Sequence, residues 1–529
     1  MQGFGPAVSS RNRVMLFWLG CVAVTAGVLL HLPMFLMSGD MGYHLAGMPM
    51  DDGMLFGMSL IVAGVAAAAF GLVPPRSAET SPDMEIVLDI ASERDLAPMH
   101  WVLAAALTVG LVIDTMKPAT LGFLIPGMTH EYGLSHTEVA VFPFSALLGT
   151  AIGSLVWGFL ADIYGRRASI LLSAIMFAAT SICGFMPSFA WNIFMCFLMG
   201  LSAGGMIPVC YALLTECIPA RHRGWMVVLV GGLGTLGGFL AASGFSAILQ
   251  PVWGWRIMWF LGLPTGLSLI LLSQLVPESP KFLILHGRTG EAAAALGRFG
   301  IAVRFRERVA AEEPVLIGRG LSLLATAKHA GVTAALVIAG LGWGLLNFGL
   351  LLWLPASLEA RGYDVVLTSS LLAQSTLIAF PTMFVVAIAY GWWSTKGSLV
   401  AALTVSLAGL AGMITLDSPY SGVFGGPIPF LVMLVVGANA IIATILPYAA
   451  ENYPLAMRGR ATGVIAASTK IGGVAAQLVG VSGIFLSLGV MSAMLIAAMA
   501  LAILLVVSFG AETRGLVLRD TNFTDAAWG

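Results

Sequence analysis

The sequence predicts an all-α membrane protein, in which an N-terminal two-helix hairpin precedes two six-helix pseudo-repeats, about 14 transmembrane helices in all. Only 10% of the 529 residues are charged and 58% are hydrophobic, whereas a soluble domain carries about 25% charged residues. The apolar residues form runs of roughly 20, long enough for a helix to cross a bilayer. A short motif also occurs at equivalent places in the two halves. The net charge of −1 gives no electrostatic reason to expect a nucleic-acid partner.

The apolar runs divide the chain into six segments. They are a membrane hairpin at 1–73, an acidic linker at 74–98, an N-terminal six-helix half at 99–276, a cytoplasmic central loop at 277–328, a C-terminal six-helix half at 329–511 and a cytoplasmic tail at 512–529. The predicted spans lie at about 14–37, 54–72, 100–126, 139–160, 168–186, 189–213, 224–249, 255–276, 330–354, 367–392, 395–415, 427–449, 462–486 and 488–510. The charged central loop is the largest gap, and it separates six core spans from the other six.

Basic residues set the orientation of these spans, because Lys and Arg concentrate in cytoplasmic loops. With the N-terminus inside, nearly all the basic residues of the loops fall inside, and only Arg256 and Arg361 fall outside. We therefore predict cytoplasmic N- and C-termini in a multi-pass protein of a bacterial inner membrane, most simply a monomer. No cleavable signal peptide is expected, since the apolar run that begins at Val14 is long and lacks a small-residue cleavage site after it.

The two halves share a motif after their fourth helix. Glu-x-x-Pro, followed by Arg-Gly, begins at Glu216 and again at Glu451, and the arginines are Arg223 and Arg458 with identical spacing. Internally repeated halves are typical of transporters, whose substrate site lies between the halves near the middle of the bilayer. The repeat therefore indicates a transporter.

Three stretches resemble a known family. Residues 158–167, which follow the second core span, read Gly-Phe-Leu-Ala-Asp-Ile-Tyr-Gly-Arg-Arg and resemble the loop between helices 2 and 3 of the major facilitator superfamily. Residues 277–283, Pro-Glu-Ser-Pro-Lys-Phe-Leu, resemble the start of the central loop in its sugar and organic-ion porters. The first core helix, with Asp114, Met116 and Pro126, is similar to metabolite–proton symporters of the aromatic-acid, nicotinate and synaptic-vesicle-protein-like branch.

The resemblance implies a twelve-helix fold that moves a small solute by alternating access, coupled to protons, with no cofactor and no enzymatic activity. Together with the repeated motif, it predicts a cytoplasmic gating cluster of Gly158, Asp162, Gly165, Arg166, Arg167, Glu216, Arg223, Glu451 and Arg458. In this cluster Gly158 would permit close helix approach, Gly165 a sharp turn, and Asp162 ion pairs with the arginines. Ser394 stands where the second half would carry the acid, so we expect an asymmetric cluster.

Two ionisable residues lie about halfway along the first core helix, where charges are costly and tend to mark function. Asp114 and Lys117 are three residues apart and share a helix face. They are either a proton-titrating acid beside a cation that binds a carboxylate substrate, or a self-neutralising pair that only allows both charges to be buried. Lys470, in the eleventh core helix, is either a structural lysine that snorkels to the cytoplasm or a ligand of the solute.

Several uncharged polar residues of the core spans could bond a solute or, equally, a neighbouring helix. They are Tyr211, Asn347, Gln374, Asn439, Tyr448 and Gln477. The glutamine cluster of sugar porters is missing from 343–348, which weighs against a hexose. The glycines within 231–238 predict close helix packing rather than a phosphate-binding loop.

The N-terminal hairpin carries soft-metal side chains near its outer loop, which include His31, Met34, His44, Met48 and Met50. Thioethers and imidazoles suit Cu(I), but methionine is also a common flexible filler at membrane boundaries. We expect the hairpin to pack outside the core, because the core already has two complete halves and the linker is a long tether.

These observations predict a secondary active transporter of a small organic acid or similar metabolite, coupled to protons, in the lipid bilayer. The alternatives are a copper-type, metal-handling permease that uses the hairpin, and a hexose or polyol porter.

Overall fold

The computed structural model describes residues 10–73, 84–88, 95–286, 288–300, 303–307, 327–360, 362, 364–415, 428–453, 455–483 and 488–514. Within these ranges only the backbone is described for Ser10, Asp162, Ala220, Leu285, Val365, Thr415 and Leu488, and for 84–88, 303–307, 327–328 and 455–460. The side chains of Asp162 and Arg458, two predicted gating residues, and all of Arg361 therefore lie outside the described part of the chain.

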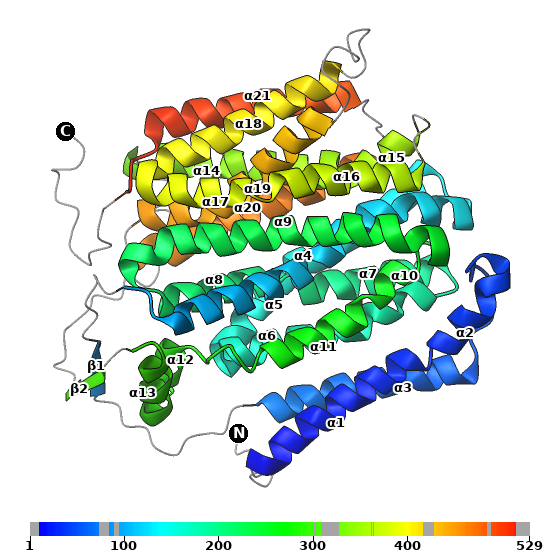
Figure 1. Ribbon diagram of the computed structural model, residues 1–529, viewed down its shortest axis with the longest axis horizontal. Coiled ribbons are helices and arrows are strands. Elements are labelled where there is room, and N and C mark those ends of the chain that lie inside the picture. The colour runs from blue at the N-terminus through cyan, green and yellow to red at the C-terminus, as the bar shows by residue number, and fades with distance from the viewer. Residues whose placement is uncertain are drawn as a thin grey trace.

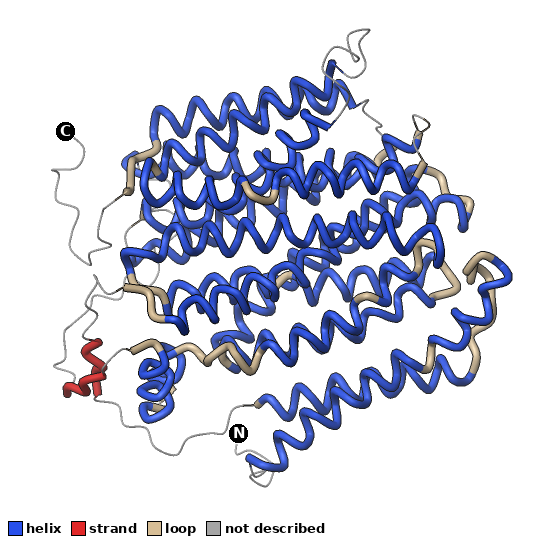
Figure 2. Tube along the Cα trace, viewed as in Figure 1, coloured by secondary structure: helices blue, strands red, loops and turns tan. Residues whose placement is uncertain are grey.

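Helices account for almost all the described chain (Figure 2). The hairpin comprises α1 (Ser10–Leu29), α2 (Leu32–Met37), η1 (Ser38–Met41) and α3 (Asp52–Leu72). The N-terminal half comprises α4 (Pro98–Tyr132), α5 (His136–Tyr164), α6 (Arg166–Ala179), η2 (Thr180–Phe185), α7 (Phe189–Ala203), α8 (Met206–Cys217), α9 (Ala220–Trp253), α10 (Ile257–Phe260) and α11 (Gly262–Leu272). The C-terminal half comprises α14 (Ala327–Gly344), η3 (Leu345–Leu351), α15 (Leu352–Glu359), α16 (Val365–Ala379), α17 (Thr382–Ile388), η4 (Ala389–Trp393), α18 (Thr395–Thr415), α19 (Ile428–Asn452), α20 (Leu455–Val481) and α21 (Leu488–Phe509).

The predicted membrane spans are present as apolar helices. In the described chain 13 helices are long and apolar enough to cross a membrane, and the remaining predicted span, 255–276, corresponds to the shorter apolar helix Ile257–Leu272. Helix ends occur where the local sequence favours them. Gly133 ends α4 with a φ of 61°, and Ser135 and Glu138 form a reciprocal capping box that starts α5. The protein is an integral, multi-pass membrane protein.

Between the halves, the central loop forms α12 (Pro280–Leu285) and α13 (Thr289–Arg298). A two-stranded antiparallel ribbon pairs β1 (Met84–Leu88) of the linker with β2 (Val303–Glu307) of the central loop. Both helices and the ribbon lie at one end of the bundle (Figure 1), which we call the inner end. The opposite end, which carries the loop between η1 and α3, is called the outer end. The first helix begins and the last helix ends on the inner side.

The two halves meet along pairs of long helices. Helix α9 packs against α16, α17 and α19, while α5 packs against α20. Towards the outer end the hydroxyl groups of Ser246 in α9 and Ser369 in α16 lie 2.9 Å apart. Within the N-terminal half, the Gln250 side chain joins α9 to α4 by donating to the Phe123 carbonyl at 3.1 Å. The N-terminal half thus presents α4, α5 and α9 to the C-terminal half, and any solute path between the halves runs beside these helices.

The hairpin lies on the flank of the N-terminal half, where α1 and α3 contact α6 (Figure 1). It therefore packs outside the core, as predicted. Its two helices approach closely through glycines. A Cβ atom added to Gly20 would lie 2.5 Å from the Gly64 carbonyl oxygen, and one added to Gly27 would lie 2.6 Å from that of Gly57.

The hairpin loop is nevertheless built into the outer end of the core. The backbone N–H groups of Leu45 and Ala46 donate to Glu131 Oε1 at 2.9 and 3.0 Å, and His44 Nδ1 lies 3.5 Å from Glu131 Oε2. Glu131 also binds Arg256, with 2.6 Å between Arg256 Nη2 and Glu131 Oε1. Arg256 is 1% exposed and also donates to the carbonyls of two residues in the η2 region. Arg256, which the predicted topology places on the outer side of the membrane, unlike nearly all the other basic loop residues, is therefore buried and paired with Glu131.

Candidate translocation site

Asp114 lies near the middle of α4, and its side chain is only 3% exposed. Among the described residues its carboxylate makes no hydrogen bond and no ion pair. Helix α4 is held tightly against α9 here, because Gly234 and Gly238 leave room for Leu111 and Thr115. The glycines of α9 thus serve close packing, as the sequence predicted. A buried acid without a contact partner in such a rigid setting is a candidate for solute or proton exchange.

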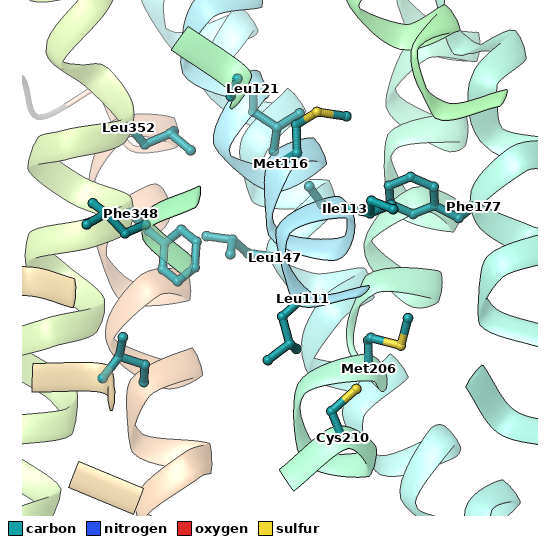
Figure 3. Packing of buried hydrophobic residues seen from close by; sticks show 14 of the residues in the cluster. Leu111, Ile113, Met116, Leu121, Leu147, Phe177, Met206, Cys210, Phe348 and Leu352 are labelled. Carbon is teal, nitrogen blue, oxygen red and sulfur yellow. The ribbon is translucent and has the colours of Figure 1, made fainter. Parts of the chain in front are cut away.

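Lys117 has its direct partners on another helix. Its ammonium group donates to the Phe177 carbonyl and to Thr180 Oγ1, the latter at 2.9 Å, and lies 3.9 Å from the centre of the Phe177 ring. These partners lie where α6 ends and η2 begins, so the lysine satisfies a free carbonyl at a helix C-terminus. Figure 3 shows Phe177 and Phe348 on opposite sides of α4. A Cβ atom on Gly262 would lie 2.4 Å from Lys117 Cε.

The two residues that the sequence placed on one helix face act on each other electrostatically but are not in direct contact. No ion pair joins Asp114 to Lys117 within the described chain. Lys117 is bound inside the N-terminal half between α4, α6 and α11, which is the arrangement of a structural lysine. The suggestion that it binds a carboxylate substrate is not supported by this geometry.

Lys470, which is partly exposed on α20, has no hydrogen-bond or ion-pair partner among the described residues. Its ammonium group lies 5.8 Å from the centre of the Phe348 ring. Phe348 belongs to η3, a stretch of π-helix, and such irregular turns occur often at functional sites. The charges of Lys470 and Asp114 act on one another, although the residues belong to opposite halves.

Two of the uncharged candidates are fully engaged in internal contacts. Gln477 is buried, donates to the Phe348 carbonyl and accepts a bond from Trp353 Nε1 at 3.1 Å. Tyr448 is buried and donates to the Ala511 carbonyl at 2.7 Å. Both side chains join helices or helix ends, so we do not include them in the site.

The other uncharged candidates are spread over different faces. Tyr211 and Asn347 are partly exposed, and Asn439 is partly exposed but donates to the Val435 carbonyl of its own helix at 2.8 Å. Gln374 is exposed on the same face of α16 as the exposed Leu377 and Ile378. That face is apolar and points out of the bundle, so Gln374 is not placed with the interior residues.

The predicted gating cluster lies at the inner end. Arg166 Nη2 is 3.5 Å from Glu216 Oε1, and Arg223 contacts the Ile218 carbonyl at 3.5 Å. In the C-terminal half Glu451 accepts bonds from Tyr390 and Thr513 at 2.9 and 2.7 Å.

The two motif copies also meet across the interface between the halves. A Cβ atom on Gly224, the glycine of the first copy, would lie 2.8 Å from Oε1 of Glu451, the acid of the second copy. The repeated motif therefore forms part of the contact surface between the halves at the inner end.

The two glycines of the cluster behave differently from one another. Gly165 has a φ of 99°, a backbone conformation that glycine adopts without strain, and it makes the turn between α5 and α6 as expected. No atom of the described residues lies within 4 Å of a Cβ atom added to Gly158. The expectation that Gly158 permits close helix approach is therefore wrong for this structure, because no neighbouring helix comes near its Cα.

Glu278 is a functional candidate to which sequence reasoning assigned no role. Its carboxylate accepts bonds from the backbone N–H groups of Arg166 and Arg167, at 2.6 and 3.2 Å, and so caps the N-terminus of α6. An added Cβ atom on Gly165 would lie 2.5 Å from Glu278 Oε2. Burial raises the pKa of Glu278, although the N–H donors favour its charged form.

Glu512 occupies the corresponding place in the C-terminal half. It accepts bonds from the Thr395 backbone N–H and side-chain hydroxyl, at 3.0 and 2.7 Å, and from Ser394, and so caps the start of α18. Burial acts to raise the pKa of Glu512, but the donors Ser394 and Thr395 outweigh it and hold that pKa below its usual value. The sequence carries one sign of this shared role. Glu278 and Glu512 each follow the sixth helix of their half, and each precedes a residue with a hydroxyl group.

Replacing Glu278 with alanine should destabilise the inner end. The N–H groups of Arg166 and Arg167 would lose a charged acceptor, and hydrogen bonds to charged groups contribute about 1.5–3 kcal/mol each. We expect Glu278→Ala to lower the thermal midpoint in detergent clearly. Glu291→Ala, which removes an exposed ion pair with Arg288, should change it little. Equal midpoints for the two variants would show that the cap is not important.

The residues of the metal hypothesis do not form a described metal site. His31 is buried with Nδ1 bonded to the Gly27 carbonyl at 2.8 Å, and Met34 is buried, while His44 pairs with Glu131. Met48 and Met50 are partly exposed. Within the described chain no group of three or more His, Cys, Asp or Glu residues is placed to hold a metal ion.

Two six-helix halves of membrane-spanning helices, with an ionisable residue from each half within the spans, define a membrane transporter. The family model described as Major Facilitator Superfamily matches residues 106–477, and the chain belongs to this family. It is a secondary transporter of small organic solutes.

Relatives and a solved structure agree with this assignment. The chain is 26% identical to a niacin transporter of Acinetobacter baylyi, over 74% of this chain and 90% of that protein. It is 26% identical to a 4-hydroxybenzoate transporter of Pseudomonas aeruginosa, over 70% and 82% of the two chains. The fold matches the proton:xylose symporter XylE with a TM-score of 0.62 and 16% identity, covering 79% of this chain and 97% of that one.

Proposed function

We propose that the protein is a proton-coupled symporter of a small organic acid, a monomer in a bacterial inner membrane with both termini in the cytoplasm. The observation that carries the proposal is the Asp114 carboxylate, which is buried in α4 without a described contact partner. An acid at membrane depth is costly, and proton relays are one of the main functions of such residues. Asp114 would take up and release one proton in each transport cycle.

The inner-end residues supply the gating part of this proposal. The Arg166–Glu216 ion pair, the caps made by Glu278 and Glu512, and the contact of Gly224 with Glu451 all lie at one end of the bundle. We propose that these contacts hold the inner end closed, and that they break when the halves rock to the inward-open state. A small difference in the free energy of these contacts between the two states is enough to bias a two-state equilibrium.

The names of the relatives support an acid as the solute. Niacin and 4-hydroxybenzoate are both aromatic carboxylic acids, and both relatives cover more than two thirds of this chain. The match to a xylose symporter is at 16% identity and supports the fold alone.

Uptake by proteoliposomes tests the proposal. The purified chain is reconstituted with a pH gradient, acidic outside, and offered radiolabelled nicotinate, 4-hydroxybenzoate, xylose and Cu(I) in parallel. We expect accumulation of at least one acid, and its collapse when a protonophore is added. Accumulation of xylose or Cu(I) alone, or uptake of an acid that ignores the protonophore, would show that the proposal is wrong.

A further inference from the structure

The structure contains two lysines at membrane depth, and they have opposite surroundings. Lys117 has a carbonyl, a hydroxyl and an aromatic ring as direct partners. Lys470 has no hydrogen-bond or ion-pair partner among the described residues, and its ammonium group lies 5.8 Å from the centre of the Phe348 ring. A cation in a span is expensive unless it pairs with something, so Lys470 is the charge whose partner remains to be identified.

The region in front of Lys470 lies between the halves. Gly473, one helical turn further along α20, allows this approach, because an added Cβ atom would lie 2.6 Å from the Phe348 ring and 3.4 Å from Leu147 of α5. Figure 3 shows Phe348 and Leu147 beside α4 at about the level of Leu111 and Ile113, and Ile113 directly precedes Asp114 in the sequence. Phe348 therefore lies at the point where α20 and η3 of one half face α4 and α5 of the other.

We propose that Lys470 is the specificity-determining residue that binds the carboxylate of the transported acid, with the Phe348 ring against the aromatic body of that acid. The inference rests on the proposed function and adds to it the group that recognises the substrate. An ammonium group pairs well with a carboxylate, and aromatic pairs add favourable contact. Lys117 is unsuitable for this role because its ammonium group is already held by the Phe177 carbonyl and Thr180 within the N-terminal half.

The charges at this site balance both without substrate and with substrate bound. Lys470 and Asp114 belong to opposite halves and act on each other electrostatically, so we take the Lys470 cation as a counter-charge of the Asp114 anion when no substrate is bound. When Asp114 takes up a proton it becomes neutral, and the substrate carboxylate takes its place as the counter-charge of Lys470. The protein therefore binds one proton and one monocarboxylate together with no net change of charge at the site, which is the requirement for one-to-one symport.

Lys470→Met and Lys470→Gln remove the positive charge and so test its role. Lys470→Arg keeps the charge and tests whether another cation can replace the lysine. The matched control is Lys396→Met, since Lys396 is a lysine at the inner end that donates to the Val507 carbonyl. The probes are nicotinate and its neutral analogue nicotinamide, and initial rates give KM and kcat in proteoliposomes. Thermal midpoints in detergent identify any variant that fails to fold.

We expect Lys470→Met and Lys470→Gln to raise the KM for nicotinate about tenfold or more, because charge-assisted hydrogen bonds are the strong ones. Lys470→Arg should recover most of the affinity, and Lys396→Met should behave like wild type. The wild-type preference for nicotinate over nicotinamide should disappear in Lys470→Met. An unchanged KM and preference in a folded Lys470→Met protein would overturn this inference and leave the proposed function standing. If the wild type accumulates no acid under a pH gradient, both are wrong.

Discussion

Asp114→Asn should abolish proton-driven accumulation of the solute while leaving exchange of solute across the membrane intact. The amide cannot take up a proton, so the proton gradient loses its point of entry into the transport cycle. For one proton per solute, a gradient of one pH unit supports about a tenfold accumulation, since about 1.4 kcal/mol corresponds to a factor of ten. In the variant the ratio of internal to external solute should fall to about one.

The measurement is accumulation of labelled solute in proteoliposomes with an imposed pH gradient, together with counterflow into solute-loaded vesicles without a gradient. Asp364→Asn is the matched control, because Asp364 only caps the N-terminus of α16 by accepting the Leu367 N–H at 2.6 Å. It should accumulate solute like wild type. If a correctly inserted Asp114→Asn protein still accumulates solute against a gradient, Asp114 is not the coupling residue.

Arg256→Met should be the most destabilising single substitution considered for the outer end. Arg256 is buried, and it donates to Glu131, to the Gly184 and Met186 carbonyls and to the Tyr132 hydroxyl. Removing it leaves the Glu131 carboxylate buried without its cation, and breaking a buried pair in this way costs about 3–5 kcal/mol. Glu131 also accepts the hydrogen bonds of the hairpin loop from Leu45 and Ala46, so we expect the loop to detach as well.

Thermal unfolding in detergent, followed by fluorescence-detected size-exclusion chromatography, measures this effect. Arg288→Met is the control, because its ion pair with Glu291 is partly exposed and should contribute only about 0–1 kcal/mol. A Glu131→Gln, Arg256→Met double variant should be less destabilised than the sum of the two single variants, since it leaves no buried charge. Similar midpoints for Arg256→Met and Arg288→Met would contradict the structural role of the buried pair.

The sequence alone was sufficient for the membrane helices and for their division into a hairpin and two halves. A long apolar run predicts a segment inside the bilayer, and such a segment must be helical because its backbone groups find no water there to bond. The turn at Gly165 and the buried position of Asp114 were predictable for a similar reason. Both depend on the residue type and its immediate neighbours, and not on the rest of the chain.

The site depended on contacts that no local pattern contains. Spacing placed Asp114 and Lys117 on one face of a helix, but spacing does not say which neighbour a side chain will contact. Lys117 turns towards α6 because Phe177 and Thr180 offer acceptors there and because Gly262 leaves the space. Only the packed structure could show this, and it shows that Lys470, from the other half, acts electrostatically on Asp114 as Lys117 does.

The same reason explains the ends of the bundle. Glu278 caps a helix that begins at Arg166, more than 100 residues earlier in the chain, and Arg256 pairs with Glu131 and thereby anchors the hairpin loop. The sequence determined that these charges exist and roughly how deep they lie in the membrane. The tertiary structure determined their partners, because a buried charge is stabilised by whichever group the fold brings within hydrogen-bond distance, however distant that group is in the chain.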